Sequence, residues 1–215
     1  MKNLVGLIVA CFFVTTVSGQ VEQFERTGDQ LWGMNYHISL PSGELNDFIG
    51  STSFRGFSFN YEKFVKNNLS VGGHIGWSIF NEQTEKGTFN FGADQGFAST
   101  AGSINAKLWK YAHVIPIEVK AKYYYNAVES APGRLFFGAG LGTSYVNQEV
   151  WVGQSEFKED NWYFSFYPEL GFDFNVSGKT HFQFSGQFNN VVNGHYGEEM
   201  LNFWSLKTGF FWRIS

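Results

Sequence analysis

The sequence contains almost no cysteine and little charge. Its 215 residues include one cysteine, Cys11, so a disulfide framework cannot be the source of stability. Charged residues make up 16%, against about 25% in ordinary soluble domains. Something other than charge must therefore keep the exterior in contact with its solvent. The net charge of -4 leaves no basic footprint, which excludes nucleic acid as a partner.

Long apolar runs are also missing beyond the N-terminus. No later segment has the roughly 18 consecutive apolar residues of a transmembrane helix, so a chain that spans a membrane must do so with strands. Residues 1–19 are typical of a signal peptide, with Lys2, an apolar stretch from Leu4 to Val14, and small residues before Gln20. A lipoprotein cleavage box at Cys11 is a weaker alternative, because the apolar stretch continues past it. Residues 20–215 form the expected mature domain.

Aromatic residues are abundant, with 25 Phe, 10 Tyr and 7 Trp, and they recur at every second position. The clearest run extends from Trp162 to Phe174, where Phe and Leu alternate with Ser, Glu, Gly and Asp. A strand places alternate residues on opposite sides, so this strand has two chemically different faces. An apolar face against lipid and a polar face inside a barrel explain that pattern.

The alternation predicts an all-β fold, an eight-stranded antiparallel up-and-down transmembrane β-barrel. The expected strands lie near residues 31–40, 54–64, 69–80, 109–125, 134–146, 161–175, 180–188 and 201–214. Connections 65–68, 126–133 and 176–179 are short, whereas 41–53, 81–108, 147–160 and 189–200 are long. Long loops then share one end of the barrel and short turns share the other, together with both termini. Pro116 and Pro168 fall inside expected strands, where they predict either bulges or strands that end sooner.

The polar faces favour lipid outside over a secreted, lipocalin-like soluble carrier, whose apolar face would line a cavity. The polar face of residues 70–78 is Ser, Gly and His, and that of 138–144 is mostly Gly. Residues this small are not typical of a water-facing surface, but they fit the narrow interior of an eight-stranded barrel. Aromatic residues near the strand ends suit two interfacial girdles: Trp32, Trp109, Tyr123, Tyr125, Trp162 and Trp212.

Larger charged side chains share the inward-facing positions. Four are acidic and four basic, and in a tight interior they must be paired. We expect them to form a network of ion pairs and hydrogen bonds that fills the barrel. A narrow ion path and a substrate site are the alternatives. The expected network comprises Glu62, Glu118, Lys120, Lys122, Glu169, Asp173, Lys207 and Arg213.

No catalytic, cofactor or metal site is expected. His37 with Ser39, and His74 with Ser78, share inward faces and are the candidates for a lipid-modifying enzyme, which would also need a nearby acid. Such spacing arises on any polar strand face, so we interpret these residues as filling the interior. The five histidines lack metal-type spacing. The glycine run at 138–142 lacks the spacing of a phosphate-binding loop.

The chain resembles the small outer-membrane β-barrel family of OmpA-like and OmpX-like proteins, especially the forms found in Bacteroidota. The resemblance rests on residues 38–43, 53–57, 71–77, 137–142 and 168–171, which are patterns of strand packing. The last strand, 206–215, is similar to the family's terminal assembly signal but ends in Ile214-Ser215 rather than in an aromatic residue.

The resemblance implies a non-enzymatic protein of the cell outer membrane. Its partners would be outer-membrane lipid and, during biogenesis, the barrel-assembly machinery. Four long surface loops would carry an envelope or interaction role towards an unknown ligand, with Trp151 and Phe157 as exposed aromatic candidates. The full OmpA domain that binds peptidoglycan is not expected, so neither is a tether to the cell wall.

Overall fold

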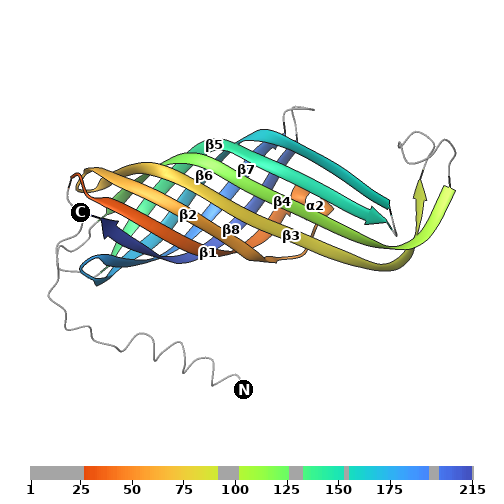
Figure 1. Cartoon of the computed structure of the whole chain (residues 1–215), viewed down its shortest axis with the longest axis horizontal. Coiled ribbons are helices and arrows are strands. Elements are labelled where there is room, and N and C mark those ends of the chain that lie inside the picture. Colours follow the sequence, from red (N-terminus) through yellow and green to blue (C-terminus); the bar gives the residue numbers. More distant parts are fainter. Residues whose placement is uncertain (1–26, 92–101, 126–132, 153–154, 194–198, 215) are drawn as a thin grey trace, which may run out of the picture.

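Eight antiparallel strands form one closed barrel in the computed structural model, in the order β1 to β8 (Figure 1). The structure describes residues 27–91, 102–125, 133–152, 155–193 and 199–214. The expected signal peptide, residues 1–19, lies outside this range. The strands are β1 (Gln30–Gly43), β2 (Ser53–Lys66), β3 (Leu69–Phe91), β4 (Gly102–Tyr125), β5 (Gly133–Val152), β6 (Ser155–Ser177), β7 (Thr180–Asn193) and β8 (Glu199–Ile214). The predicted eight-stranded barrel is therefore confirmed.

Closure comes from pairing between the first and last strands. β1 pairs with β8 in one unbroken antiparallel register from Gln30↔Ile214 to Gly43↔Leu201. No helix in the described part of the chain is long and apolar enough to cross a membrane. The one described helix, α2 (Glu44–Phe48), follows β1 directly.

Most of the residues expected in long loops are strand, which corrects the prediction. β3 continues to Phe91, β5 to Val152 and β7 to Asn193, and β6 begins at Ser155. The physical reason is that cross-strand pairing continues beyond the apolar belt: Glu149 lies opposite Lys158, and Trp109 opposite Trp151. The polar composition of these segments predicted loops. Their backbone groups are nevertheless hydrogen-bonded between strands, as they are within the apolar belt.

Both strand prolines interrupt a ladder without shifting its register. β3 and β4 pair at Ile75↔Ile117 and again at Ser78↔Val114, so the gap faces Pro116. β6 and β7 pair at Phe166↔Asn190 and again at Glu169↔Gln187, so the gap faces Pro168. The prolines are therefore neither bulges nor strand ends, because each strand keeps its other neighbour through the gap.

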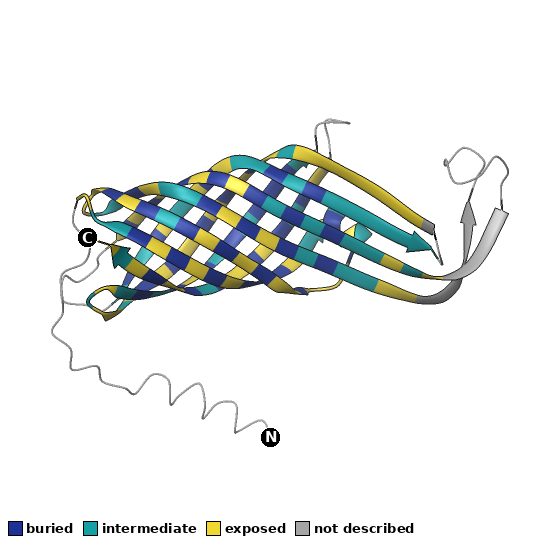
Figure 2. Ribbon diagram, in the orientation of Figure 1, coloured by how far each residue is buried: buried dark blue, intermediate teal, exposed yellow. Residues whose placement is uncertain are grey.

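The two faces of the wall differ as a membrane requires. Buried and exposed residues alternate along each strand (Figure 2), and the exposed set is dominated by Phe, Trp, Leu, Ile and Val. Ser, Asn, Gln, Glu and Lys are buried instead. A lipocalin-like carrier would have the opposite polarity, and the structure argues against that alternative.

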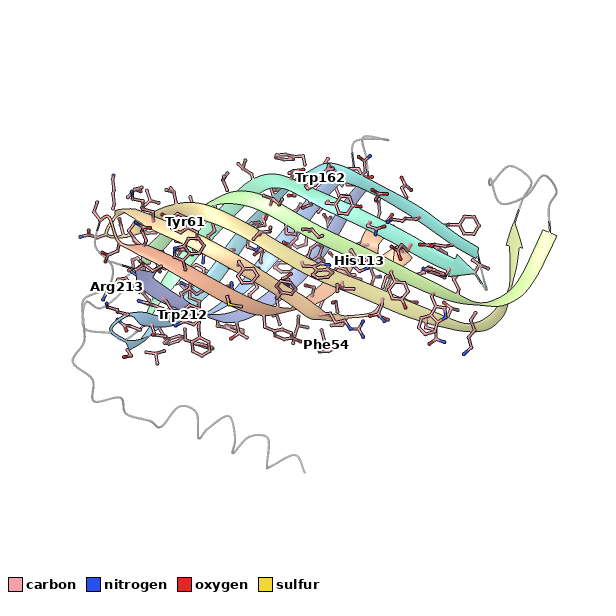
Figure 3. All side chains as sticks on the ribbon, in the orientation of Figure 1. Phe54, Tyr61, His113, Trp162, Trp212 and Arg213 are labelled. Carbon is pink, nitrogen blue, oxygen red and sulfur yellow. The ribbon has the colours of Figure 1, made fainter. Side chains whose placement is uncertain are left out.

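Exposed aromatic side chains occur towards both ends of the barrel. The exposed Trp212 and the half-buried Tyr61 lie near the end at which β1 begins and β8 ends, whereas the exposed Trp162 lies in the other half (Figure 3). Each of the six aromatic residues expected in girdles is exposed. Between the two groups the exterior is mostly Phe and aliphatic, which is the exterior that a bilayer solvates.

Candidate functional site

The interior of the barrel begins with an apolar layer at the short-turn end. Leu31, Phe64, Tyr124, Phe136 and Phe211 pack together there and are almost completely buried. The rings of Phe64 and Tyr124 lie 5.3 Å apart, and those of Tyr124 and Phe136 lie 5.6 Å apart. Alternation on five strands places these residues inward, and they close this end of the barrel.

Above that layer, Glu62 joins four side chains. Its carboxylate lies 2.8 Å from the Lys120 ammonium and 3.1 Å from that of Lys122. The Tyr124 hydroxyl donates to it at 2.6 Å and the Ser70 hydroxyl at 3.0 Å. Glu62 comes from β2, whereas its two cationic partners come from β4. The contacts therefore cross β3 rather than join neighbouring strands.

Glu169 joins the opposite wall. Its carboxylate lies 3.6 Å from Lys122 and 3.3 Å from Lys207, and the Ser185 hydroxyl donates to it at 2.7 Å. Lys207 also donates to the Gln187 side chain at 2.6 Å. Glu62, Lys122, Glu169 and Lys207 thus form one chain of contacts across the barrel.

Asp173 has a partner that the sequence analysis missed. Arg134 is fully buried and contacts the Asp173 carboxylate at 2.8 and 2.9 Å, while its guanidinium lies 3.9 Å from the centre of the Tyr124 ring. Arg134 shares the inward parity of Gly138 and Gly140, so the alternation could have identified it. It was overlooked because the expected strand began at this residue.

Arg213, in contrast, lies at the rim. It is 3.6 Å from Asp29 and donates to the Gly178 carbonyl in the β6–β7 turn. The structure therefore brings seven of the eight expected network residues into the interior, and Arg134 supplies the fourth cation there. Amides also complete the network: Asn60 accepts from Lys120, and Gln183 accepts from Lys122.

Histidines, serines and one carboxylate meet farther up. His74 Nδ1 lies 3.1 Å from Glu118, and the Ser165 hydroxyl donates to the same carboxylate at 2.8 Å. A nucleophilic triad needs the imidazole between the hydroxyl and the acid, whereas here the acid lies between the other two. His37 Nδ1 lies 3.4 Å from the Ser39 hydroxyl, and no carboxylate among the described residues is hydrogen-bonded to it. His37 Nε2 is buried without a hydrogen-bond partner, and the described residues do not form a hydrolytic arrangement.

A small cavity lies between these groups and the far mouth of the barrel. Its walls include His37, His74, Gln187, Ser205 and Lys207, and it has room for about one water molecule. No group of three or more potential metal ligands occurs among the residues that the structure describes. A buried space this small does not hold a cofactor or a lipid substrate.

A second apolar layer closes the far mouth. Leu45 and Ile49, from α2 and the residue after it, are fully buried against Phe80 and Phe203. Lys110 donates to the Phe48 carbonyl at 2.8 Å, and Glu82 accepts from the Gly50 amide at 2.6 Å. We call residues 44–50 the plug. The sequence contained its signal, because Leu45, Phe48 and Ile49 have the spacing of one helix face.

The interior therefore has three levels, with paired charges between two apolar layers. Removing one partner of such a pair would leave an uncompensated ion in a dry space. The arrangement can hold eight strands in register, but it offers no water-filled path.

Comparisons with known proteins agree with this architecture. The sequence matches no protein-family model, and the comparison with curated proteins finds no match. Among solved structures, Neisserial surface protein A has a TM-score of 0.52 at 13% identity, over 87% of this chain and 97% of that one. The outer membrane protease OmpT from Escherichia coli has a TM-score of 0.50 at 13% identity, over 74% of this chain and 63% of that one.

Identities this low show a shared fold and nothing about activity. A closed antiparallel barrel with an apolar exterior is the form in which strands cross a bacterial outer membrane. The chain is a small eight-stranded β-barrel of the outer-membrane type, and its place is the outer membrane.

Proposed function

We propose that this protein is a non-enzymatic, non-conducting scaffold that holds paired strands at the cell surface on a rigid membrane-embedded frame. The observation that carries the proposal is the sealed interior. Ion pairs connect β2, β4, β6 and β8 across the lumen, and an apolar layer lies on each side of them. A channel would need a continuous polar path, and the two apolar layers interrupt it.

Among the described residues, the frame presents a projecting sheet over most of the segments expected to be long loops. β3, β4, β5 and β6 extend farthest beyond the barrel (Figure 1). Of the two aromatic candidates for surface contact, Trp151 has the outward parity of Tyr145 on β5 and Phe157 has the inward parity of Ser165 on β6, but Phe157 is the more exposed of the two. The surface role, towards a ligand still to be identified, belongs to this projecting sheet.

Biogenesis would depend on the barrel-assembly machinery acting on β8. This strand provides the pairing with β1 that closes the barrel. Its outward residues Trp204, Leu206, Phe210 and Trp212 are exposed, and they would form the apolar face that the machinery recognises, although the chain ends in Ile214-Ser215.

Solute entry into liposomes tests the proposal directly. Vesicles containing the refolded full chain should swell in small sugars no faster than empty vesicles, whereas vesicles with a general porin should swell at once. Folding is verified by the shift in gel mobility between unheated and heated samples. Swelling at porin-like rates would contradict the sealed interior.

The lipid-modifying alternative needs a separate test. His37→Ala and His74→Ala should leave the lipid A of the expressing cells unchanged, because neither histidine belongs to a triad. Altered lipid A in either variant would replace the scaffold with an enzyme.

A further inference from the structure

The outward face of the projecting sheet changes character sharply where the apolar belt ends. On β3 to β6 the last belt residues are Ile79, Ile115, Tyr145 and Trp162. Trp77, one step below, bonds through its indole nitrogen to His113 at 3.3 Å, and the Tyr145 hydroxyl donates to Asp160 at 2.9 Å. Rings with bonded polar tips mark the level at which hydrocarbon gives way to head groups.

Beyond that level, aromatic rings and polar side chains lie together on neighbouring strands. Trp109 lies directly opposite Trp151, and Tyr111 directly opposite Glu149. The rings of Trp109 and Tyr111 are parallel within 2° with their centres 6.5 Å apart. Gln83 lies beside Trp109, and Lys158 beside Glu149. We call this set the outer platform: Gln83, Trp109, Tyr111, Glu149, Trp151 and Lys158.

This combination fits a sugar better than a phosphate. The C–H face of a pyranose packs on an aromatic ring, and its hydroxyls both donate to and accept from amides and carboxylates. A phosphate site needs clustered cations, but Lys158 is the only cation on the platform and Glu149 faces it. Glu156 and Asp160 flank Lys158 on the same face, and Lys107 has outward parity on β4. With Glu149, three carboxylates therefore face two cations, and this surface has no excess of positive charge.

Position identifies the source of the sugar. The platform continues directly from the lipid-facing belt on the same four strands, at the level where head groups lie. In a Gram-negative outer leaflet those head groups are the saccharides of glycolipids. We propose that the outer platform binds the sugar head group of an outer-leaflet glycolipid, whose acyl chains pack on the belt below it. The opposite half of the wall lacks a counterpart among the described residues, because β1, β2, β7 and β8 end close to the belt.

The chain supplies a matched control for this site. Trp32 and Trp212 also form a directly opposed, outward-facing tryptophan pair at the other end of the barrel. Both are exposed, as Trp109 is, whereas Trp151 is half-buried. Two double variants therefore remove a pair of indole rings from one end of the barrel or from the other: Trp109→Ala/Trp151→Ala and Trp32→Ala/Trp212→Ala. Heat-modifiable gel mobility shows whether each variant is folded.

Binding is measured on the full chain in detergent by native mass spectrometry, with rough-type lipopolysaccharide as the probe. Loss of the Trp109–Trp151 pair should weaken binding about tenfold, and loss of the Trp32–Trp212 pair should change it by less than about twofold. Glu149→Gln and Lys158→Ala keep the rings and test the polar groups. Glu149→Gln should weaken binding, whereas Lys158→Ala should leave it nearly unchanged.

Four outcomes would overturn the proposal. Equal losses from both tryptophan pairs would indicate ordinary girdle contact with lipid. Equal affinity for phosphatidylglycerol would show that the platform does not recognise the sugar. A dominant loss in Lys158→Ala would identify a phosphate site instead. Equal affinity for the free core oligosaccharide would identify a soluble glycan as the ligand. None of these outcomes bears on whether the barrel conducts, so the scaffold proposal stands or falls separately.

Discussion

At the residue scale, Glu62 is the interior carboxylate that contacts both Lys120 and Lys122. It contacts two ammonium groups and two hydroxyls. Glu62→Gln removes the charge but little volume, leaving the nearby ammonium groups of Lys120 and Lys122 undercompensated. We expect the free energy of unfolding to fall by about 3 kcal/mol, measured by urea titration of the vesicle-embedded protein with tryptophan fluorescence.

Asp160→Asn is the control for that substitution. Asp160 also bonds a tyrosine, at 2.9 Å from the Tyr145 hydroxyl, but on the exposed face. Its loss should cost less than about 1 kcal/mol. If the two substitutions cost the same, the interior pairs would add nothing to stability beyond ordinary surface contacts.

Gly140 tests how closely the interior is packed. A Cβ at this position would overlap the Tyr167 ring, which is buried. Gly140→Val should therefore reduce the free energy of unfolding by about 2 kcal/mol. Ala139→Val, one residue away on the lipid face, should be nearly neutral in the same urea titration. A neutral Gly140→Val would show that the lumen has spare room.

At the element scale, Asn190 compensates for the proline in β6. Its side-chain amide lies 3.4 Å from the Phe166 carbonyl and 3.2 Å from that of Phe188, beside the gap that faces Pro168. Asn190→Ala should cost about 1 kcal/mol. In a Pro168→Ala background the restored N–H should reduce that cost, so a double-mutant cycle should show coupling between the two sites. Strict additivity would show that Asn190 and the proline gap are unrelated.

The plug should stabilise the barrel without being its only seal. Leu45→Ala and Ile49→Ala should each cost about 2 kcal/mol, because both side chains are fully buried. Replacing the plug, residues 44–50, with a Gly-Ser linker should still leave liposome swelling at its baseline, since the charged and lower apolar levels stay filled. Rapid swelling of that variant would make the plug the sole barrier.

The alternation of apolar and polar residues predicted the strands well wherever lipid lies on one side of the wall and the packed lumen on the other. All eight strands were located from the apolar belt, because hydrocarbon outside and a cramped lumen inside leave each position little choice. Above the belt water lies outside, and residues such as Asn147 and Glu149 resemble a loop although they pair in register with β4 and β6. The sequence also did not show how a proline fits inside a strand. The Asn190 amide, which compensates for the missing N–H of Pro168, is on a different strand and has no local sequence signal.

The interior could be predicted by parity but not by pairing. The inward positions of Glu62, Lys122 and Glu169 follow from alternation, whereas the contacts among them depend on stagger between strands that are distant in sequence. Arg134 is the exception, because it lies directly opposite its partner Asp173 on the neighbouring strand, so the register of one strand pair would have predicted their contact. The position of Arg213 at the rim depends on the closed barrel.

At the scale of the whole molecule, the account requires lipid outside and a dry, filled lumen inside. Cysteine chemistry can test both together, because Cys11 is the only cysteine in the sequence and the barrel itself has none. Single-cysteine variants on β2, β5 and β6 are spin-labelled and placed in vesicles. Each label then reports its contact with oxygen, which dissolves in lipid, and with a polar nickel complex, which stays in water.

The decisive measurement is therefore this accessibility profile at Leu141, Ser58 and Lys158. We predict that a label at Leu141 relaxes with oxygen alone and one at Lys158 with the nickel complex. A label at Ser58, which is buried in the lumen, should respond to neither. Nickel relaxation at Leu141, or at Ser58 in a folded barrel, would contradict the arrangement on which every inference above depends.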